Sequence, residues 1–390
     1  MDTDMVYNLS VSDGTNVWNL YSGLTSNYPN ITGLNVSTNV SVGNYNLQYT
    51  PEKSVSKLIY EAALPTYGEV QYYINGTSTL ATATLRSMND VNNLGGTETS
   101  KTIDNITIHR NDFYSINLSE NVKSIPNRFG YYMQNLVSAD ISSTKIVNIS
   151  DGFLSRAYNF VNLSVIPNTV SNIGNSFMDS CYNFNQLFNV PDSVTTIGDS
   201  FMVLCNNFNL PLNVPNSVTT IGNYFMYLCY NFNQSLKLPN NLSVIESYFL
   251  SYCNNFNQPI NIPNSVTTIG KGFMNSCLIF NQPFILPDSV ETIGAYFFYR
   301  CIDFNQNIVI PSSVSAVGTD FMHNCNSMSS TVMINCNAES FANSNNTLAV
   351  YNNSVVAYTN GIKISGINAQ NFVNRFPNRT SLPYRKLILA

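Results

Sequence analysis

A cysteine recurs every 24 residues through most of the second half of this chain. The seven cysteines in this register are Cys181, Cys205, Cys229, Cys253, Cys277, Cys301 and Cys325. A glycine and a phenylalanine follow at the same spacing, and only Glu246 interrupts the glycine series. A fixed period of this size predicts a stacked solenoid, because one short repeat cannot bury its own apolar side chains and needs its neighbours to complete the core.

Each repeat carries signals for a short strand, a turn and a close approach between coils. In the repeat that begins at Cys253, Ile260 and Ile262 alternate with polar neighbours, as in a strand with one buried face. Pro263 ends this strand, because proline has no N–H to donate. Gly270 indicates either a positive φ or a close approach between neighbouring coils.

The last part of each repeat has helical spacing, which predicts a helix of one or two turns that closes the coil. In the same repeat the apolar residues at this spacing are Phe273, Met274, Cys277 and Phe280. Weaker copies of the pattern continue upstream of the cysteines and end downstream with a last strand at Val332 and Ile334. We therefore predict a β-rich α/β solenoid of about nine 24-residue coils over residues 105–336, about 40–45 Å long at the usual spacing of neighbouring strands.

The segments outside the repeats have a different pattern. Residues 1–104 contain short alternating strands separated by turn signals such as Asn75-Gly76, which predicts a small antiparallel, sandwich-like β domain. We expect this domain to serve anchoring or assembly. Residues 337–390 contain two or three further candidate strands and are predicted to form a C-terminal β cap, because the last coil of a solenoid must cover its apolar face.

The run I-P-[ND]-S-V-T-T-I-G-x-x-F-M-x-x-C-x-x-F resembles the BspA-type leucine-rich repeat of bacterial and protozoan surface proteins, whose common form is I-P-x-S-V-T-S-I-G-x-x-A-F-x-x-C-x-x-L. This chain departs from that form in three ways: Phe-Met replaces Ala-Phe, Phe replaces the last Leu, and each coil has one extra residue. The resemblance implies a horseshoe or slightly twisted rod and non-enzymatic adhesion or recognition. The first hundred residues lie outside it.

Composition and the N-terminus narrow the possible partners and locations. Charged residues make up 10% of the chain, the net charge is −5 and no Lys/Arg run occurs, so we expect no nucleic-acid partner. No apolar stretch is long enough to span a membrane, and no signal peptide precedes the first strand in the chain as given. We expect no membrane insertion and a location on a virion surface or outside the cell.

Catalytic, cofactor and metal sites are not expected. Each coil offers one thiol, whereas metal sites need pairs. The Cβ atoms of stacked cysteines would lie about 4.8 Å apart, too far for disulfides, so the seven cysteines are predicted to be buried and free. His109 and His323 fall in different coils and have no recurring acid beside them. Cys336 lies outside the cysteine register and could be exposed, but we assign it no role.

Positions that vary from coil to coil are the candidate binding residues, and they fall on two faces. On the strand face they are Asn189, Asn213, Lys237, Asn261, Ile285 and Val309. On the opposite face they are Tyr224, Tyr227, Tyr248, Tyr252, Tyr296, Tyr299 and Arg300. Tyrosine and arginine are favoured at interfaces, although these tyrosines could instead pack against the predicted helix of their own coil.

An asparagine column has two interpretations. It comprises Asn185, Asn209, Asn233, Asn257, Asn281 and Asn305. These residues could form a binding stripe, but we expect a ladder that satisfies backbone groups at a bend of each coil.

These features predict a non-enzymatic recognition or structural protein. The favoured context is a phage virion component (tail, baseplate or head decoration) that joins other virion or surface proteins through its N-terminal domain and could bind a host-surface protein or glycan. A bacterial or protozoan cell-surface adhesin is the first alternative. A polysaccharide-degrading, tailspike-like enzyme, which would need facing carboxylates, is the second.

Overall fold

The structure is a computed structural model, and it describes residues 66–74, 77–327 and 330 in full. Outside these ranges it describes the backbone of eight strands. These are β1 (Val6–Ser12), β2 (Val17–Leu24), β3 (Asn39–Val42), β4 (Tyr45–Gln48), β5 (Lys57–Ala63), β24 (Thr331–Ile334), β25 (Val355–Tyr358) and β26 (Ile388–Leu389). Cys336 lies outside the described residues.

The first five strands pair with one another in antiparallel fashion. A three-stranded sheet has the order β2-β1-β5, and β3 and β4 form a separate hairpin. None of these strands pairs with a strand of the repeats among the described residues.

A cap covers the first coil of the solenoid. It consists of β6 (Gly68–Tyr73), β7 (Leu80–Leu85), α1 (Met88–Asn93), β8 (Ser100–Ile103) and β9 (Ile106–His109). Helix α1 begins with a capping box, in which the Ser87 hydroxyl accepts a hydrogen bond from Asp90 N–H and the Asp90 side chain accepts one from Ser87 N–H. Val70 and Val91 are fully buried in the same core as the repeats. Part of the range expected to be the N-terminal β domain, from Thr66 onward, therefore shares its core with the solenoid.

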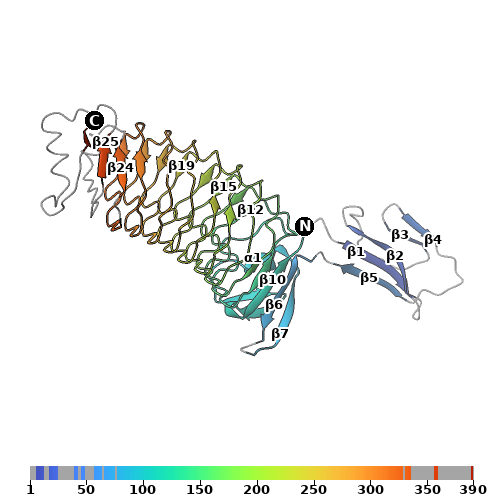
Figure 1. Ribbon diagram of the computed structural model, residues 1–390. Helices are drawn as coiled ribbons and strands as arrows, with labels where there is room; N and C mark the ends of the chain where they lie inside the picture. The colour runs from blue at the N-terminus through green and yellow to red at the C-terminus, as the bar shows by residue number, and fades with distance from the viewer. Residues whose placement is uncertain are drawn as a thin grey trace.

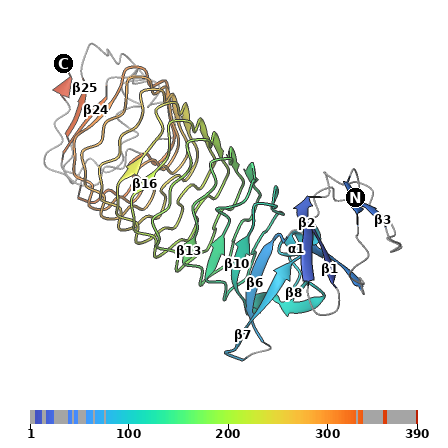
Figure 2. The ribbon, with the colours of Figure 1, turned by 90° about the vertical axis from the view of Figure 1, so that its right-hand side faces the viewer.

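The repeats wind into an elongated β-solenoid of about eight turns, close to the nine predicted (Figure 1). The first coil is joined on its outer side by the antiparallel strand β6, and most residues beyond Ser327 lie outside the described ranges. Figure 2 shows the coils stacked side by side with strands on more than one side. The long axis of the solenoid runs from the β6–β7 cap to β24.

Two strand ladders run along the solenoid. The first ladder contains β10 (Phe113–Leu118), β11 (Ser138–Asp140), β13 (Asn162–Leu163), β16 (Leu212–Asn213), β18 (Leu236–Lys237), β22 (Ile308–Ile310) and β24. The second contains β12 (Asn148–Ile149), β14 (Asn172–Ile173), β15 (Thr196–Ile197), β17 (Thr220–Ile221), β19 (Val244–Ile245), β20 (Thr268–Ile269), β21 (Thr292–Ile293) and β23 (Ala316–Val317). Pairing between coils is parallel, and in the second ladder each partner lies 24 residues away, for example Ile197 with Ile221.

The last strand of the repeats was predicted correctly: β24, which contains Val332 and Ile334, pairs with β22. Strands β25 and β26 continue this parallel pairing. Because most of residues 337–390 lie outside the described ranges, the C-terminal cap stays a prediction.

The predicted helix in each coil is wrong. The segment between the glycine and the cysteine of each repeat, here called the turn segment, forms consecutive turns, and α1 is the one α-helix among the described residues. In one turn segment, Tyr224 and Leu228 have left-handed backbones, with φ of 57° and 64°. The N–H groups of Tyr224, Met226 and Leu228 donate to carbonyls of the next coil at 2.8, 3.0 and 2.9 Å. These bonds between coils replace the bonds that a helix would make within one coil, so the α/β label does not apply to the solenoid.

The glycine column is explained by close approach rather than by positive φ. A Cβ atom on Gly270 would lie 2.7 Å from the backbone of the preceding coil, at Glu246 C and Ser247 N. Gly270 N–H donates to Ile245 O at 2.7 Å. The second ladder is interrupted between β17 and β19, in the coil where Glu246 replaces the glycine. We attribute the interruption to the glutamate Cβ, which prevents the same close approach.

The core consists of side chains stacked on their equivalents from coil to coil. Phe177 and Phe201 stack with ring centroids 5.0 Å apart, and the same contact recurs along the phenylalanine column. The seven cysteines are buried and free, as predicted. Each thiol donates to a carbonyl of the preceding coil, as Cys229 Sγ does to Met202 O at 2.9 Å. Burial raises the pKa of every one of these thiols, to about 12 for Cys229 and Cys325.

Candidate binding surfaces

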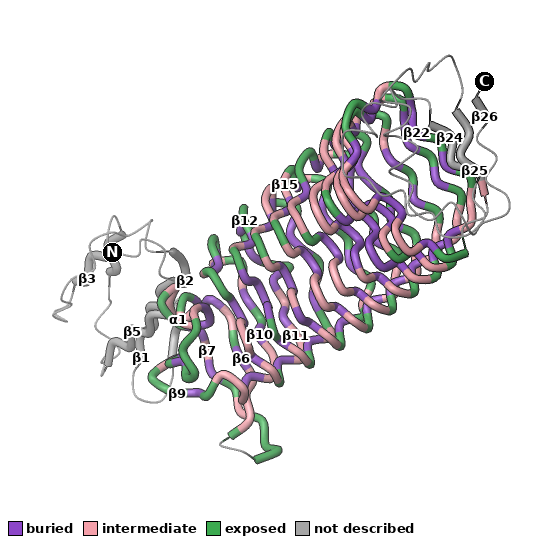
Figure 3. The backbone as a smooth tube through the Cα atoms, turned by 90° about the vertical axis from the view of Figure 1, so that its left-hand side faces the viewer, coloured by how far each residue is buried: buried purple, intermediate pink, exposed green. Residues whose placement is uncertain are grey.

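The strand face carries the first set of candidates. Figure 3 shows how buried and exposed positions alternate along each turn. Asn189, Asn213, Lys237, Asn261, Ile285 and Val309 are all exposed and lie in one column 24 residues apart. Ile285 is 79% exposed, an unusual value for an isoleucine. Val165, one period before Asn189 and 76% exposed, belongs to the same column, and sequence analysis missed it although the spacing identified it.

The first ladder is incomplete along this face. No strand is formed at residues 188–190, 260–262 or 284–286. Pro259 and Pro283 stand directly before two of these segments and have no N–H to donate to a neighbouring coil. Pro211 does not have this effect, because β16 begins directly after it. A hollow of about 290 Å³ lies between the coil of Ile285 and that of Val309.

Near the N-terminal cap the same face is polar. A groove of about 390 Å³ crosses β6, β10, β11 and β13, and its lining includes Glu69, Gln71, Asn117, Asp140, Asn162 and Gln186. Ser115 Oγ donates to Gln71 Oε1 at 2.9 Å. Burial acts to raise the pKa of Asp140, but hydrogen bonds from Ser142 and Ser164 outweigh it and hold the pKa below its usual value. The strand face thus carries a polar groove near the cap and the exposed apolar residues Ile285 and Val309 toward the C-terminal end, with Val165 as an exposed apolar residue between them and the cap.

On the opposite side, the tyrosines of the turn segments contact one another. Tyr224 and Tyr248 stack with ring centroids 5.1 Å apart and planes 5° apart. The edge of Tyr227 meets Tyr224 at 5.3 Å, Tyr248 at 6.0 Å and Tyr252 at 5.7 Å. Tyr224 is 38% exposed, and the other three are half-buried. The alternative that these rings pack against a helix of their own coil is wrong, because that helix is absent from the described turn segments.

The tyrosine column lacks a ring in one coil, and a lysine side chain lies between the rings on either side of it. Gly272 occupies the position that Tyr248 and Tyr296 hold in the coils before and after it. Lys271 Nζ lies 5.5 Å from the ring centre of Tyr248 and 5.2 Å from that of Tyr296, so a cation replaces the missing ring. A hydrogen bond with Tyr248 and the charges of the neighbouring phenols raise the pKa of Lys271.

The cluster continues toward the C-terminus. Tyr296 meets Tyr299 edge to face at 5.3 Å, and Tyr299 stacks on His323 at 5.4 Å. Arg300 is exposed beside them. We call the set Tyr224, Tyr227, Tyr248, Tyr252, Lys271, Tyr296, Tyr299 and Arg300 the tyrosine surface. Ring and cation contacts join the six predicted tyrosines through Lys271, and Arg300 is exposed next to Tyr299 in the sequence.

A second aromatic cluster was missed by sequence analysis. Tyr132, Tyr158 and Tyr182 form a chain of ring contacts at 5.7 and 4.8 Å in the coils nearest the cap. The Arg110 guanidinium lies 4.5 Å above the ring of Tyr132, and Arg128 and Arg156 lie 5.7 and 5.9 Å from that of Tyr131. The signal was available, because Tyr158 and Tyr182 are 24 residues apart, but the first of these coils lack the cysteine that marks the register.

The asparagine column forms the predicted ladder. Asn185 Oδ1 accepts a hydrogen bond from Asn209 N–H at 3.0 Å, and the equivalent bond links every later member of the column. The side chains therefore satisfy backbone donors of the next coil. Asp151, Asn175, Asp199 and Asn223 form a parallel ladder that was not predicted.

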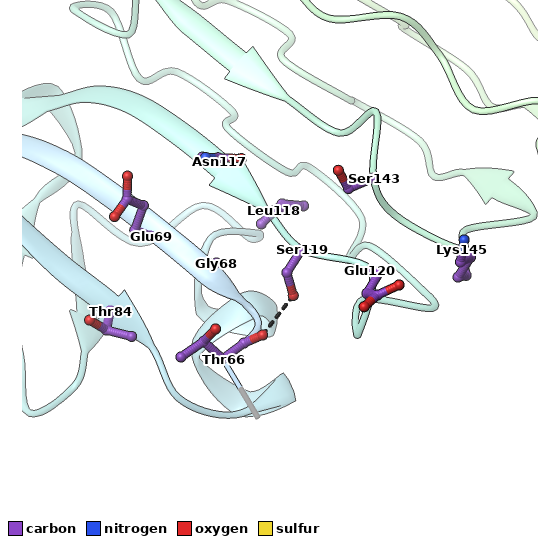
Figure 4. A pocket seen from close by; sticks show the side chains of 10 residues that line it. All are labelled: Thr66, Gly68, Glu69, Thr84, Asn117, Leu118, Ser119, Glu120, Ser143 and Lys145. Carbon is purple, nitrogen blue, oxygen red and sulfur yellow. Dashed lines mark hydrogen bonds between the residues drawn. The ribbon is translucent and has the colours of Figure 1, made fainter. Parts of the chain in front are cut away.

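A wide hollow is lined by residues of β6, β7 and β10 and of the segments that follow β10 and β11 (Figure 4). Its volume is about 700 Å³, and its charged lining residues are Glu69, Glu120 and Lys145. Ser119 Oγ and Asn121 Nδ2 donate to Thr66 O at 2.6 and 3.0 Å, which ties residue 66 to the first coil.

Within the described residues, no group of three or more His, Cys, Asp or Glu side chains is arranged to hold a metal ion. His323 Nδ1 lies 3.7 Å from Asp320 Oδ1, and His109 Nδ1 accepts a hydrogen bond from Asn111 N–H. No helix of the described chain has the length and apolar character needed to cross a membrane.

The family comparison agrees with the architecture. The profile of the BspA type leucine rich repeat region matches in six copies, over residues 75–185, 101–233, 177–285 and 280–376. A leucine-rich repeat protein from Bacteroides ovatus is similar at 20% identity with a TM-score of 0.43, and the match covers 69% of this chain and 70% of that one. A leucine rich cell surface protein from Faecalibacterium prausnitzii is similar at 13% identity with a TM-score of 0.36, covering 75% and 93%.

The pneumococcal vaccine antigen PcpA is similar at 11% identity with a TM-score of 0.34, and the match covers 83% of this chain and 97% of that one. A search of curated proteins found no match. The family profile spans well over half of the chain and coincides with the coils described above. The chain therefore belongs to the BspA-type leucine-rich-repeat family.

Proposed function

We propose that this protein is a non-catalytic recognition protein that binds its ligand through the tyrosine surface. The observation that carries the proposal is the contact between Tyr224, Tyr227 and Tyr248, which hold one another in place while Tyr224 remains 38% exposed. Tyrosine contributes a large apolar ring and a polar hydroxyl, and rings that are already ordered lose little entropy on binding.

The cations of this surface favour a ligand that offers both apolar and anionic groups. Lys271 lies between two rings and Arg300 is exposed at the C-terminal end of the cluster. A host-surface glycan with carboxylate or phosphate groups would combine ring contacts with these charges, and a protein epitope rich in such groups is the alternative. The strand face is the competing surface, because Ile285 and Val309 are exposed there.

The N-terminal strands support a separate role in attachment. Strands β1 to β5 pair among themselves and lie before Thr66, where the chain is tied to the first coil. We propose that this segment joins the protein to a larger assembly while the solenoid presents the binding surface. A phage virion is the favoured assembly, and a bacterial or protozoan cell surface is the alternative.

Binding by full-length variants tests which face is used. Tyr248→Ala removes the ring that contacts Tyr224, Tyr227 and Lys271, and Ile285→Ala is the matched control on the strand face. Binding is measured to host cells and to an array of purified host-surface glycans. We expect Kd to rise about 30-fold for Tyr248→Ala, the size of an interface hot spot, and to stay within about twofold for Ile285→Ala. The reverse pattern would assign binding to the strand face.

Fractionation tests the proposed context. Mass spectrometry should find the full-length protein in purified phage particles rather than in cell-surface fractions, and a chain without residues 1–65 should retain ligand binding but fail to enter the assembly. Recovery from cell-surface fractions alone would favour the adhesin alternative. Release of reducing ends from a host polysaccharide by the full-length protein would instead support the enzyme alternative.

A further inference from the structure

The strand β7 is the outermost strand of the sheet at the N-terminal end of the solenoid. The sheet has the order β13-β11-β10-β6-β7, so β6 pairs with one edge of β7 and no described strand pairs with the other (Figure 1). The pairing of β6 with β7 is regular over six residue pairs, from Gly68 with Leu85 to Tyr73 with Leu80. An unpaired strand edge presents backbone donors and acceptors that another strand can use.

This edge lacks the features that normally prevent pairing between chains. The sequence of β7 is Leu-Ala-Thr-Ala-Thr-Leu, with no charge and no proline, and no bulge occurs between β6 and β7. The next residue, Arg86, is engaged by Asp104, whose Oδ1 accepts a hydrogen bond from Arg86 Nε at 2.8 Å. Leu80 and Thr82 are exposed.

Hydrogen-bond geometry decides which residues of β7 face the open edge. Ile74 N–H donates to Thr79 O at 3.0 Å and Tyr67 N–H donates to Leu85 O at 2.8 Å, so the odd-numbered residues of β7 bond to β6. Leu80, Thr82 and Thr84 therefore direct their N–H and C=O groups away from β6, toward the open edge.

We propose that β7 pairs with β7 of a second copy of this chain, in antiparallel fashion about a two-fold axis through Thr82. In this register Thr82 lies opposite Thr82 and Leu80 lies opposite Thr84, so all three outward-bonding residues are used, with about six hydrogen bonds between the chains. Ala81 lies opposite Ala83, and no like charges face each other. The axis would direct the two solenoids away from each other, which gives a particle with two copies of the tyrosine surface.

Sedimentation velocity of the full-length protein over a range of about 1–100 μM tests this proposal. The wild-type protein should show a concentration-dependent monomer–dimer equilibrium. Thr82→Pro removes an N–H that points to the open edge but none that bonds to β6, so it should raise the dimer Kd at least tenfold with little change in Tm. Thr82→Val keeps that N–H and should dimerise like the wild type.

A charge exchange tests the register. Thr82→Lys and Thr82→Glu should each weaken the dimer, because like charges then lie opposite one another, and an equimolar mixture of the two should form a heterodimer that dissociates at high salt. A protein that is monomeric at every concentration would overturn the proposal. So would a dimer that Thr82→Pro leaves unchanged, or a mixture of the two charged variants that associates no better than either variant alone.

Discussion

The interior and the outer surface of the solenoid follow different rules. Inside, the phenylalanine and cysteine columns repeat with little variation, because each side chain packs on its equivalent in the neighbouring coil and one misfit would affect two interfaces. Outside, the column of Asn261 along the first ladder and the column of Tyr248 in the turn segments both change from coil to coil. The difference shows where this chain is constrained by folding and where it is free to vary for recognition.

The largest effect on folding is expected from deleting part of a coil, because the columns after the deletion would no longer match the columns before it. Deleting 24 residues, from Cys229 to Tyr252, rejoins equivalent positions, so we expect a folded protein of slightly lower stability. Deleting only 12 residues would place inward columns against outward ones and should prevent folding. Circular dichroism and thermal denaturation distinguish the two. Similar behaviour of both deletions would contradict the stacked-coil account.

Alkaline pH should lower the free energy of unfolding through the buried cysteine thiols of the interior. The buried thiols have raised pKa values, about 12 for Cys229 and Cys325, whereas an unfolded cysteine titrates near 8.5. Above the unfolded pKa the unfolded state has released protons that the folded state still holds, so the free energy of unfolding falls as pH rises from about 8.5 to 12.

We expect a loss of about 1 kcal/mol for each buried thiol between pH 8 and 9.5, measured by urea denaturation. The Cys253→Ala variant is the control, because it should lose less stability over the same interval. A free energy of unfolding that does not change between pH 8 and 9.5 would show that the thiols are not buried as described.

A methyl group in the glycine column should test close packing between coils. A Cβ on Gly294 would lie 2.5 Å from backbone atoms of Gly270 and Lys271. Gly294→Ala should therefore lower the free energy of unfolding by about 1–3 kcal/mol. Glu246→Gly, at the natural exception, should change it by less than about 1 kcal/mol, because the restored close approach offsets the conformational freedom of glycine. Equal effects at the two positions would contradict our explanation of the break between β17 and β19.

The smallest effect is expected on the surface. Lys271→Ala removes the cation between Tyr248 and Tyr296, and a cation–π contact of an exposed lysine contributes about 0.5–1 kcal/mol. Thermal denaturation should show a correspondingly small decrease in Tm. A decrease in stability as large as that of Gly294→Ala would mean that Lys271 is needed for folding and is not a freely variable surface residue.

Much of the fold was predictable because the interior repeats. The 24-residue period of Cys181 to Cys325 correctly predicted stacked coils and buried free thiols, and the asparagine column predicted the ladder of Asn185 and Asn209. The turn segment was mistaken for a helix, because Phe273, Met274 and Cys277 have apolar spacing that suits either structure. Hydrogen bonds between coils stabilise turns instead of a helix in this segment, and the sequence of a single repeat does not reveal those bonds.

For the candidate surfaces, the sequence predicted which residues share a column but not which side chains are in contact. Spacing placed Tyr224 and Tyr248 on one face, and the structure shows them stacked. Spacing did not reveal that Lys271 fills the gap at Gly272, because the contact depends on where the lysine side chain turns. The cluster of Tyr132 and Arg110 was missed because residue 110 lies between the cap and the first coil and has no equivalent in the repeats.

The most direct test of the described interior is whether the seven cysteines of the inward column are accessible to a thiol reagent. The native protein is treated with iodoacetamide, and labelled peptides are quantified by mass spectrometry before and after denaturation. We predict that Cys181, Cys205, Cys229, Cys253, Cys277, Cys301 and Cys325 stay unlabelled in the native state and all react after denaturation without prior reduction. Reaction at Cys336 alone would be compatible with this result. Rapid native labelling of several of the seven, or peptides joined by disulfides among them, would contradict it.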